Sequence, residues 1–360
     1  MFNSARLTLA RQRRKLTKKA LAEALAVHQK TIVRWESGRA DPTEENIEAF
    51  SRVLRFPSGF FLSVSEIDTV KPDAVSFRAL SAMPSRDRDS ALASASFAFV
   101  LSDWVNDQFN LPPHDLLDFQ EQTDPEAAAV MLREKWGLGV RPISNVVRLL
   151  EVKGVRVFSL TDNTDSLDGI SMWRRNIPYI FISAAKTAER SRHSAAHELG
   201  HLCLHKHGGP RGRTAEDQAN LFAASFLMPR SEVLARLPRV NALQQIVEGK
   251  KHWKVSVAAL NYRLHKLGVT SEWQYKQFCI QIQKFRKSEP YGIPKETSTV
   301  WDQVFAALRN DGVSKPKLAN TLNLPVTEIE DLIFGLTNMQ SIEGNAISPS
   351  KSRARLSLVT

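Results

Sequence analysis

The stretch HELGHLCLH at residues 197–205 constrains this chain more than any other. It contains the pattern H-E-x-x-H, in which His197, Glu198 and His201 occupy the fixed positions. Histidines four residues apart on a helix project from one face, about one turn from each other, so both imidazoles can reach one ion. The pattern predicts a helix that carries two metal-ligating histidines, and such a helix needs a packed scaffold behind it.

This helix is expected to span residues 186–205, KTAERSRHSAAHELGHLCLH. An apolar stripe beside the histidines would pack on a small sheet. Its members are Ala195, Ala196, Leu199 and Leu202. His193 and His205 extend the ladder of histidines at the same spacing, but each step of four residues turns by about 40° around a straight helix. We therefore expect neither of these outer histidines to be a ligand.

A catalytic zinc site usually has three protein ligands and one open position for water, so a third ligand is required. Glu216 is the candidate, because it follows His201 by 15 residues, in the order that gluzincins use. Small residues share its helix face and would let that face approach the histidine helix closely. Asp217 points about 100° away and is the weaker alternative, with the loop residue His207 as the next to consider.

Composition limits the class of protein. A length of 360 residues predicts two or three domains. The formal net charge of +11 favours a polyanionic partner. Cys203 and Cys279 are too few and too far apart for a disulfide framework, and we expect both to be buried. Because there is no run of about 18 apolar residues, we expect no membrane partner and a cytoplasmic location.

The first 62 residues contain twelve Lys and Arg against six Asp and Glu, a charge of 12 − 6 = +6. Within them, LTKKALAEALAVHQKTIVRWESGRADPT resembles the helix-turn-helix of the XRE or phage-repressor family. We expect Thr17 to cap the second helix, Gly38 to close the third, and Trp35 and Phe50 to be core. The positions that match the family pattern are Leu16, Thr17, Leu21, Ala22, Val27, Ile32, Glu36, Gly38 and Pro42.

The resemblance implies that the helix beginning at Gln29 enters the major groove of an operator in double-stranded DNA. By position, Gln29, Lys30 and Val33 would face the bases, while Thr31 and Arg34 would flank them. Gln suits adenine and Lys suits guanine. The alternative is that the bundle serves only for dimerisation or protein docking.

Phosphate contacts are implied for the start of the preceding helix. Lys18 would meet a phosphate, as could Arg11 or Arg39. The same resemblance makes a homodimer on a palindromic operator the expected assembly.

Two later blocks, AAHELGHLCLH and EDQANLFAASFLMP, resemble the ImmA/IrrE metallopeptidase family. The resemblance implies an endopeptidase of narrow specificity that uses Zn²⁺ as its cofactor. By position, His197, His201 and Glu216 would bind zinc. Glu198 would be the general base that takes a proton from the attacking water and passes it to the leaving amine.

The expected fold class is mostly α with a small β-sheet (α+β). It comprises an N-terminal helix-turn-helix bundle, a zincin-like peptidase core and C-terminal helical subdomains. Strands are predicted by alternating or apolar β-branched and aromatic runs at residues 155–160, 169–175 and 177–183. The predicted divisions are a DNA-binding domain at 1–62, a linker at 63–88, a peptidase domain at 89–230, helical subdomains at 231–336 and a disordered tail at 337–360.

Helix-turn-helix spacing recurs at residues 314–336, in SKPKLANTLNLPVTEIEDLIFGL. Its second helix would present Glu328, Glu330 and Asp331, which repel phosphates. We therefore predict a docking or dimerisation element there, and no DNA reading. In residues 231–287, the anchors Trp253, Tyr262, Trp273 and Phe278 are expected in the core.

Three functions fit these features. The first is a DNA-binding regulator that relieves repression by cleaving an XRE-type repressor, itself or a partner, in a stress or mobile-element regulon. The second is a non-proteolytic transcriptional regulator, or the antitoxin of a toxin-antitoxin pair, in which the peptidase-like domain is a sensor. The third is a peptidase whose helix-turn-helix only recruits a protein.

Overall fold

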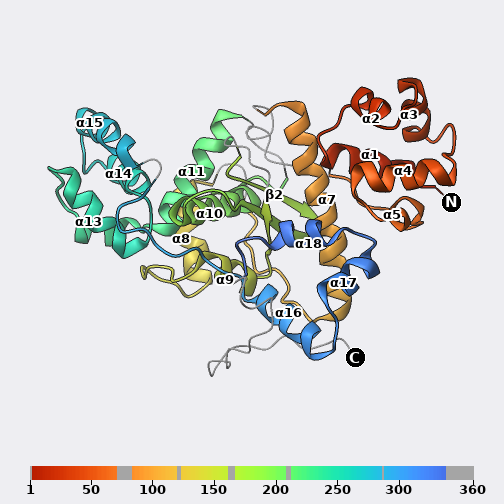
Figure 1. The fold of residues 1–360 in the computed structure, drawn as a ribbon. Helices are drawn as coiled ribbons and strands as arrows, with labels where there is room; N and C mark the ends of the chain where they lie inside the picture. Colours follow the sequence, from red (N-terminus) through yellow and green to blue (C-terminus); the bar gives the residue numbers. More distant parts are fainter. Residues whose placement is uncertain are drawn as a thin grey trace.

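The chain is mostly helical and has one three-stranded sheet in the part that the structure describes (Figure 1). The structure is a computed structural model, and it describes residues 2–70, 83–119, 123–160, 167–207, 212–285 and 288–337. The predicted α+β class is confirmed. Among the described helices, none is both long and apolar enough to cross a membrane.

Five short helices at the N-terminus pack around one apolar core. They are α1 (Ser4–Arg13), α2 (Lys18–Ala24), α3 (Gln29–Glu36), α4 (Glu44–Leu54) and α5 (Ser58–Leu62). The Thr17 side chain accepts a hydrogen bond from the Ala20 amide at 3.0 Å, and Gly38 has φ +68° just after α3. Both predicted helix ends are thus confirmed. Trp35 and Phe50 are buried with ring centroids 5.3 Å apart, as core residues should be.

Helix α7 (Ser85–Gln108) connects this bundle to the sheet. It begins within the predicted linker. Near its middle, Phe97 lies against Phe56 and Phe60 of the N-terminal bundle, with ring centroids 5.5 and 5.9 Å apart. Farther along, Ser102 shares a hydrogen bond of 3.0 Å with the Tyr179 hydroxyl of the sheet. One helix therefore packs on both parts of the molecule.

The sheet has the strand order β1-β3-β2. Its strands are β1 (Arg156–Leu160), β2 (Gly169–Arg174) and β3 (Ile177–Ser183), which confirms the three predicted strands. β1 runs parallel to β3 and β2 runs antiparallel to it. A two-residue turn joins β2 to β3, and its residues Arg175 and Asn176 both have positive φ, as the tight turn of a hairpin requires.

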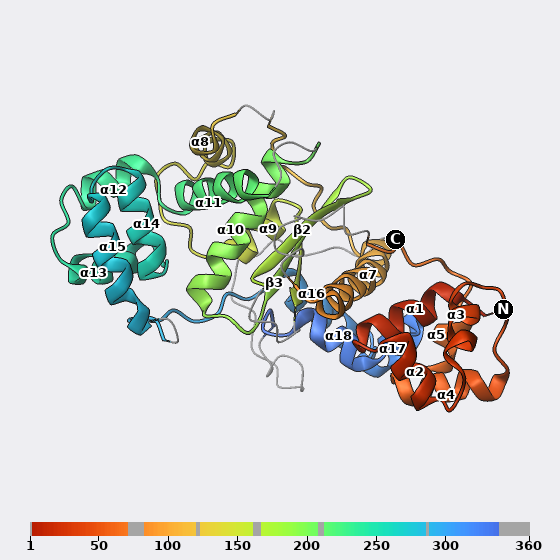
Figure 2. The ribbon, with the colours of Figure 1, turned by 90° about the horizontal axis from the view of Figure 1, so that it is seen from above.

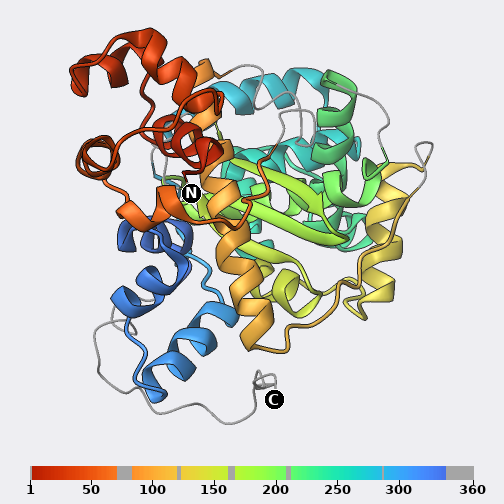
Figure 3. The same ribbon diagram turned by 90° about the vertical axis from the view of Figure 1, so that its right-hand side faces the viewer.

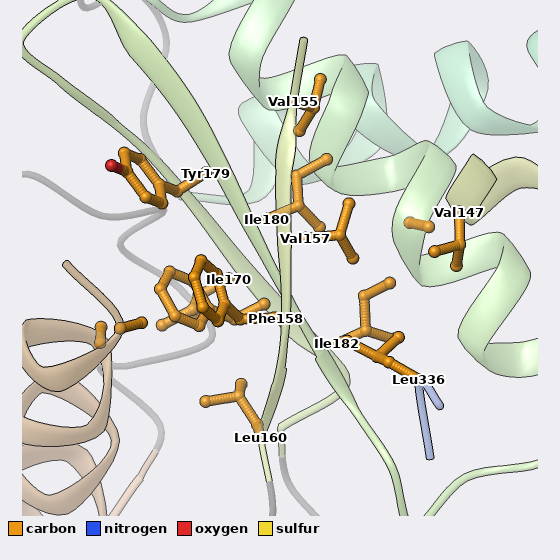
Figure 4. Packing of buried hydrophobic residues seen from close by; sticks show 14 of the residues in the cluster. Val147, Val155, Val157, Phe158, Leu160, Ile170, Tyr179, Ile180, Ile182 and Leu336 are labelled. Carbon is orange, nitrogen blue, oxygen red and sulfur yellow. The ribbon is translucent and has the colours of Figure 1, made fainter. Parts of the chain in front are cut away.

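The two faces of the sheet are both covered. Figure 4 shows Phe158, Ile170 and Tyr179 on one face and Val157 and Ile180 on the other. Figure 2 shows the sheet between α10 on one side and α7 with α18 on the other. Because side chains alternate along a strand, the register decides which residues of β2 face α10.

Helix α10 (Ala188–Leu204) packs on β2 and β3, and α11 (Arg213–Leu227) packs on α10. The close contact depends on small residues. Ala219 and Ala223 of α11 are fully buried, as expected, and a Cβ added at Gly200 of α10 would lie 3.0 Å from the Phe222 ring. The helices α8 (Pro125–Lys135) and α9 (Val146–Val152) complete this layer.

The remaining helices form two groups. The first comprises α12 (Arg230–Arg236), α13 (Leu243–Trp253), α14 (Val257–Lys266), α15 (Glu272–Ile282) and the 3₁₀ turn η2 (Gln283–Phe285). In this group Trp253 and Phe278 are buried. Two expectations were wrong: Trp273 is 70% exposed and Cys279 is only half-buried. Both lie on α15, whose buried residues are Phe278 and Ile282.

The second group comprises α16 (Val300–Asn310), α17 (Lys315–Leu322) and α18 (Val326–Ile333). Figure 3 shows it beside α7 and below the N-terminal helices. Glu328 is buried here rather than presented on the surface, which corrects the expectation that it would repel phosphates. The predicted tail, Thr337 apart, lies outside the described residues.

Candidate metal centre and nucleic-acid interface

The structure brings His197 and His201 of α10 together with Glu216 of α11. One ligand atom from each lies within 4.8 Å of the others. The two Nε2 atoms are 3.1 Å apart, and the carboxylate oxygens of Glu216 lie 3.5 Å from His197 Nε2 and 3.6 Å from His201 Nε2. Two imidazoles and one carboxylate are a donor set that suits zinc and leaves a position for water.

The alternative ligands lie elsewhere. Asp217 is 68% exposed and stands 3.8 Å from Arg213, so it points away from α10. His207 is exposed and lies 2.6 Å from Asp118. His193 is likewise outside the cluster. Helix geometry explains the outcome, because adjacent residues of a helix point about 100° apart and only one carboxylate can face α10.

The imidazole orientations fit a metal site. His197 Nδ1 lies 3.0 Å from Asn220 Oδ1, which accepts only, so the proton is on Nδ1. His201 Nδ1 lies 2.9 Å from His205 Nδ1, and His205 Nε2 lies 2.9 Å from Gln218 Oε1. If His205 donates from Nε2, it accepts at Nδ1, and His201 then donates from Nδ1. With Nδ1 occupied as a donor in both histidines, Nε2 is the nitrogen that faces Glu216 and that could bind a metal in the neutral imidazole.

Charge at the site favours a cation. Burial raises the pKa of Glu216, but hydrogen bonds and charge interactions with His197 and His201 outweigh it and hold that pKa well below its usual range. Burial lowers the pKa of His197, while Glu216 and Glu198 raise it, and the net shift is upward. Positive charge is thus stabilised between these groups, as a divalent ion requires.

Glu198, between the two histidines in sequence, faces the sheet and is only 4% exposed. Ser171 of β2 donates a hydrogen bond to its Oε2 at 2.6 Å. A Cβ added at Gly169, two residues earlier on the same face of β2, would lie 3.1 Å from Glu198 Cγ. β2 therefore determines where the Glu198 carboxylate lies. Sequence reasoning missed Ser171, although a hydroxyl inside the apolar run GISMW is a signal that could have found it.

Helix α3 lies at the outer end of the N-terminal bundle (Figure 1). Gln29, Lys30 and Arg34 are exposed, Val33 is 40% exposed, and Thr31 is half-buried. The opposite face of the same helix holds Ile32 and Trp35, which are buried in the core of the bundle. The proposed reading residues thus share one accessible surface.

Two family models match the chain. Residues 7–61 match a helix-turn-helix model, and residues 150–265 match a peptidase model described as the IrrE N-terminal-like domain. The chain joins a helix-turn-helix domain to an IrrE N-terminal-like domain. Both predicted resemblances are confirmed, in the predicted order. A search of curated proteins gives no match.

The IrrE N-terminal-like domain contains the whole candidate metal centre, because its match covers the sheet, α10 and α11 and extends through α13 into α14. The helices α7, α8 and α16–α18 lie outside both matches. The match therefore includes every residue of the candidate metal centre but not α7, the helix that packs on both the N-terminal bundle and the sheet.

The proposed phosphate contacts of the helix-turn-helix domain have different surroundings. Arg11 is buried and forms an ion pair of 2.5 Å with Glu36 inside the domain. The suggestion that Arg11 meets a phosphate is therefore wrong. Lys18 lies 3.3 Å from the same carboxylate but remains 41% exposed, and Arg39 is exposed. Lys18 and Arg39 stay candidates.

Proposed function

We propose that this protein is a DNA-binding transcriptional regulator whose IrrE N-terminal-like domain is a zinc-dependent endopeptidase. Its reaction would relieve repression by cutting an XRE-type repressor, either another protein or a second copy of this chain. The observation that carries the proposal is the convergence of His197, His201 and Glu216, with Nδ1 of both histidines engaged by a neighbouring side chain and Nε2 of both facing Glu216.

The helix-turn-helix domain would bring this activity to an operator. Its charge of +6 and the exposed polar face of α3 support binding to double-stranded DNA. We propose a homodimer on a palindromic site in the cytoplasm, the arrangement typical of such domains. A peptidase tethered to an operator would meet a repressor bound nearby at a high effective concentration.

The residues have separate roles in the proposed hydrolysis. Zinc held by His197, His201 and Glu216 would supply Lewis-acid activation, lowering the pKa of water to about 7. Glu198 would accept a proton from the attacking water at a carboxylate oxygen and pass it to the leaving amine. Ser171 would hold Oε2 of Glu198, which leaves Oε1 to take the proton.

Comparison of Glu198→Gln with His197→Ala tests the proposal. Glu198→Gln should keep about one zinc per chain but lose all cleavage of XRE-type repressors, because an amide cannot take a proton from water. His197→Ala should lose both the metal and the cleavage. Bound zinc, repressor cleavage and expression of the controlled operon are the readouts.

The same pair of variants decides between proteolysis and sensing. If Glu198→Gln leaves regulation in cells intact while His197→Ala destroys it, the metal has a structural or sensory role. The proposal would then give way to the non-proteolytic regulator or antitoxin.

A further inference from the structure

A cavity of about 720 Å³ lies away from the metal centre, beside the N-terminal end of α9. Three segments form its walls: residues 138–152, the turn at Lys254 after α13, and residues 293–297 ahead of α16. Its volume is in the range of small-molecule sites. Its lining includes none of the metal-centre residues, so the cavity is a separate feature of the molecule.

Four cationic side chains line this cavity: Arg141, Arg148, Lys254 and Lys295. Within the described residues, none of the four forms an ion pair with a carboxylate. Their hydrogen bonds go to neutral oxygens instead. Arg148 donates to the Thr297 hydroxyl at 3.0 Å, and Lys254 donates to the Ser144 carbonyl at 3.2 Å. These contacts orient the side chains without neutralising them.

Glu296 contributes the lone carboxylate of the lining, and its charge is already compensated. Its Oε1 accepts a hydrogen bond from Arg192, which is 1% exposed, and its Oε2 accepts from the amides of Val146 and Val147 at 2.7 and 3.2 Å. Because Arg192 already balances Glu296, the four lining cations remain unopposed. Counted over the lining residues alone, the formal charge of the cavity is 4 − 1 = +3.

Apolar side chains complete the lining, so the uncharged part of a ligand that binds there should be apolar. They are Leu138, Pro142, Ile143, Leu149, Val152, Ile293 and Pro294. A cavity with apolar walls and a few convergent charged groups is the usual form of a small-molecule site. Several cations suit a group that carries more than one negative charge, as a phosphate monoester does near neutral pH.

We propose that this cavity binds a small phosphate monoester with an apolar body, with the phosphate among Arg141, Arg148, Lys254 and Lys295. Such a ligand would contact both the segment around α9 and the turn after α13. It would therefore bind between the catalytic scaffold and the α12–α15 helices. The site is distinct from the proposed peptidase centre and does not depend on zinc.

Isothermal titration of the full-length protein with 1-naphthyl phosphate tests this proposal. We expect saturable binding of one molecule per chain, weaker binding of inorganic phosphate and no binding of 1-naphthol, which lacks the charge. Arg148→Gln with Lys254→Gln should weaken 1-naphthyl phosphate binding by about tenfold or more. Arg239→Gln with Lys317→Gln, an exposed pair outside the cavity, should leave it unchanged.

Because Arg148 also donates a hydrogen bond to Thr297, its substitution could affect folding, so a second variant is needed as a control. Arg141→Gln with Lys295→Gln removes the two exposed cations and should weaken binding in the same direction, with an unchanged melting temperature. Absence of saturable 1-naphthyl phosphate binding, or equal loss in the control pair, would overturn the proposal. Neither result bears on zinc binding or cleavage, so the two proposals fail separately.

Discussion

Arg13 of α1 and Glu328 of α18 form a buried ion pair, with 2.6 Å between Nε and Oε2. The side chains are 5% and 1% exposed. Arg14 reaches the other oxygen of Glu328 at 2.6 Å, and Arg13 also contacts Asp331 at 3.0 Å. The docking element predicted at the C-terminus thus docks on the helix-turn-helix domain of its own chain.

Removal of this charge should destabilise the chain. Glu328→Gln leaves Arg13 buried without a full counter-charge, so we expect a loss of about 3 kcal/mol in the free energy of unfolding, measured by urea denaturation. Glu330→Gln on the same helix is the matched control. Glu330 is 47% exposed in its pair with Lys315, and its loss should change stability by less than about 1 kcal/mol. Equal effects of the two variants would contradict the finding.

Adjacent carboxylates of α11 should differ in their effect on the metal. Glu216→Ala should abolish stoichiometric zinc binding, whereas Asp217→Ala should keep it, because only Glu216 faces the histidines. Measurement of zinc after dialysis against a weak chelator checks this. Full zinc in Glu216→Ala would show that the third ligand has been misassigned.

The hydrogen bond from Ser171 to Glu198 should matter for the reaction but not for the metal. Ser171→Ala should keep zinc and slow repressor cleavage by about tenfold, since the base loses its orientation. In a Glu198→Gln background the same change should have no further effect on the residual rate. An additive loss there would mean that Ser171 acts independently of Glu198.

Base reading by α3 predicts a selective defect. Gln29→Ala with Lys30→Ala should abolish operator specificity while fold and zinc content persist. Each lost base contact should cost about 1 to 3 kcal/mol of binding free energy. A footprint on the operator that survives the double substitution would remove these two residues from the reading face.

Phosphate contact by Lys18 predicts a different signature. Lys18→Ala should weaken binding to all sequences alike and reduce the slope of log affinity against log salt by about 0.9. Glu36 retains Arg11 at 2.5 Å, so the domain should stay folded. A sequence-selective loss with the slope preserved would instead assign Lys18 to base reading.

The sequence by itself determined the local features of this protein. The spacing of His197 and His201, the cap at Thr17 and the alternation of the three strands depend on helix and strand periods of a few residues. Such periods can be read directly from the amino-acid sequence. The α+β class could therefore be predicted without coordinates. The helix-turn-helix and peptidase resemblances, and their order, came instead from motifs that match known families.

Only the tertiary structure decided which distant groups meet. Helix packing placed Glu216 opposite the histidines, the register of β2 put Ser171 under Glu198, and the docking of α18 buried Glu328 on Arg13. A charged residue can be a solvated surface group, a phosphate ligand or a buried ion-pair partner, and its own sequence neighbourhood does not distinguish them. The choice depends on contacts between different helices and strands, from 27 residues apart for Ser171 and Glu198 to 315 for Arg13 and Glu328, and these arise only when the elements pack.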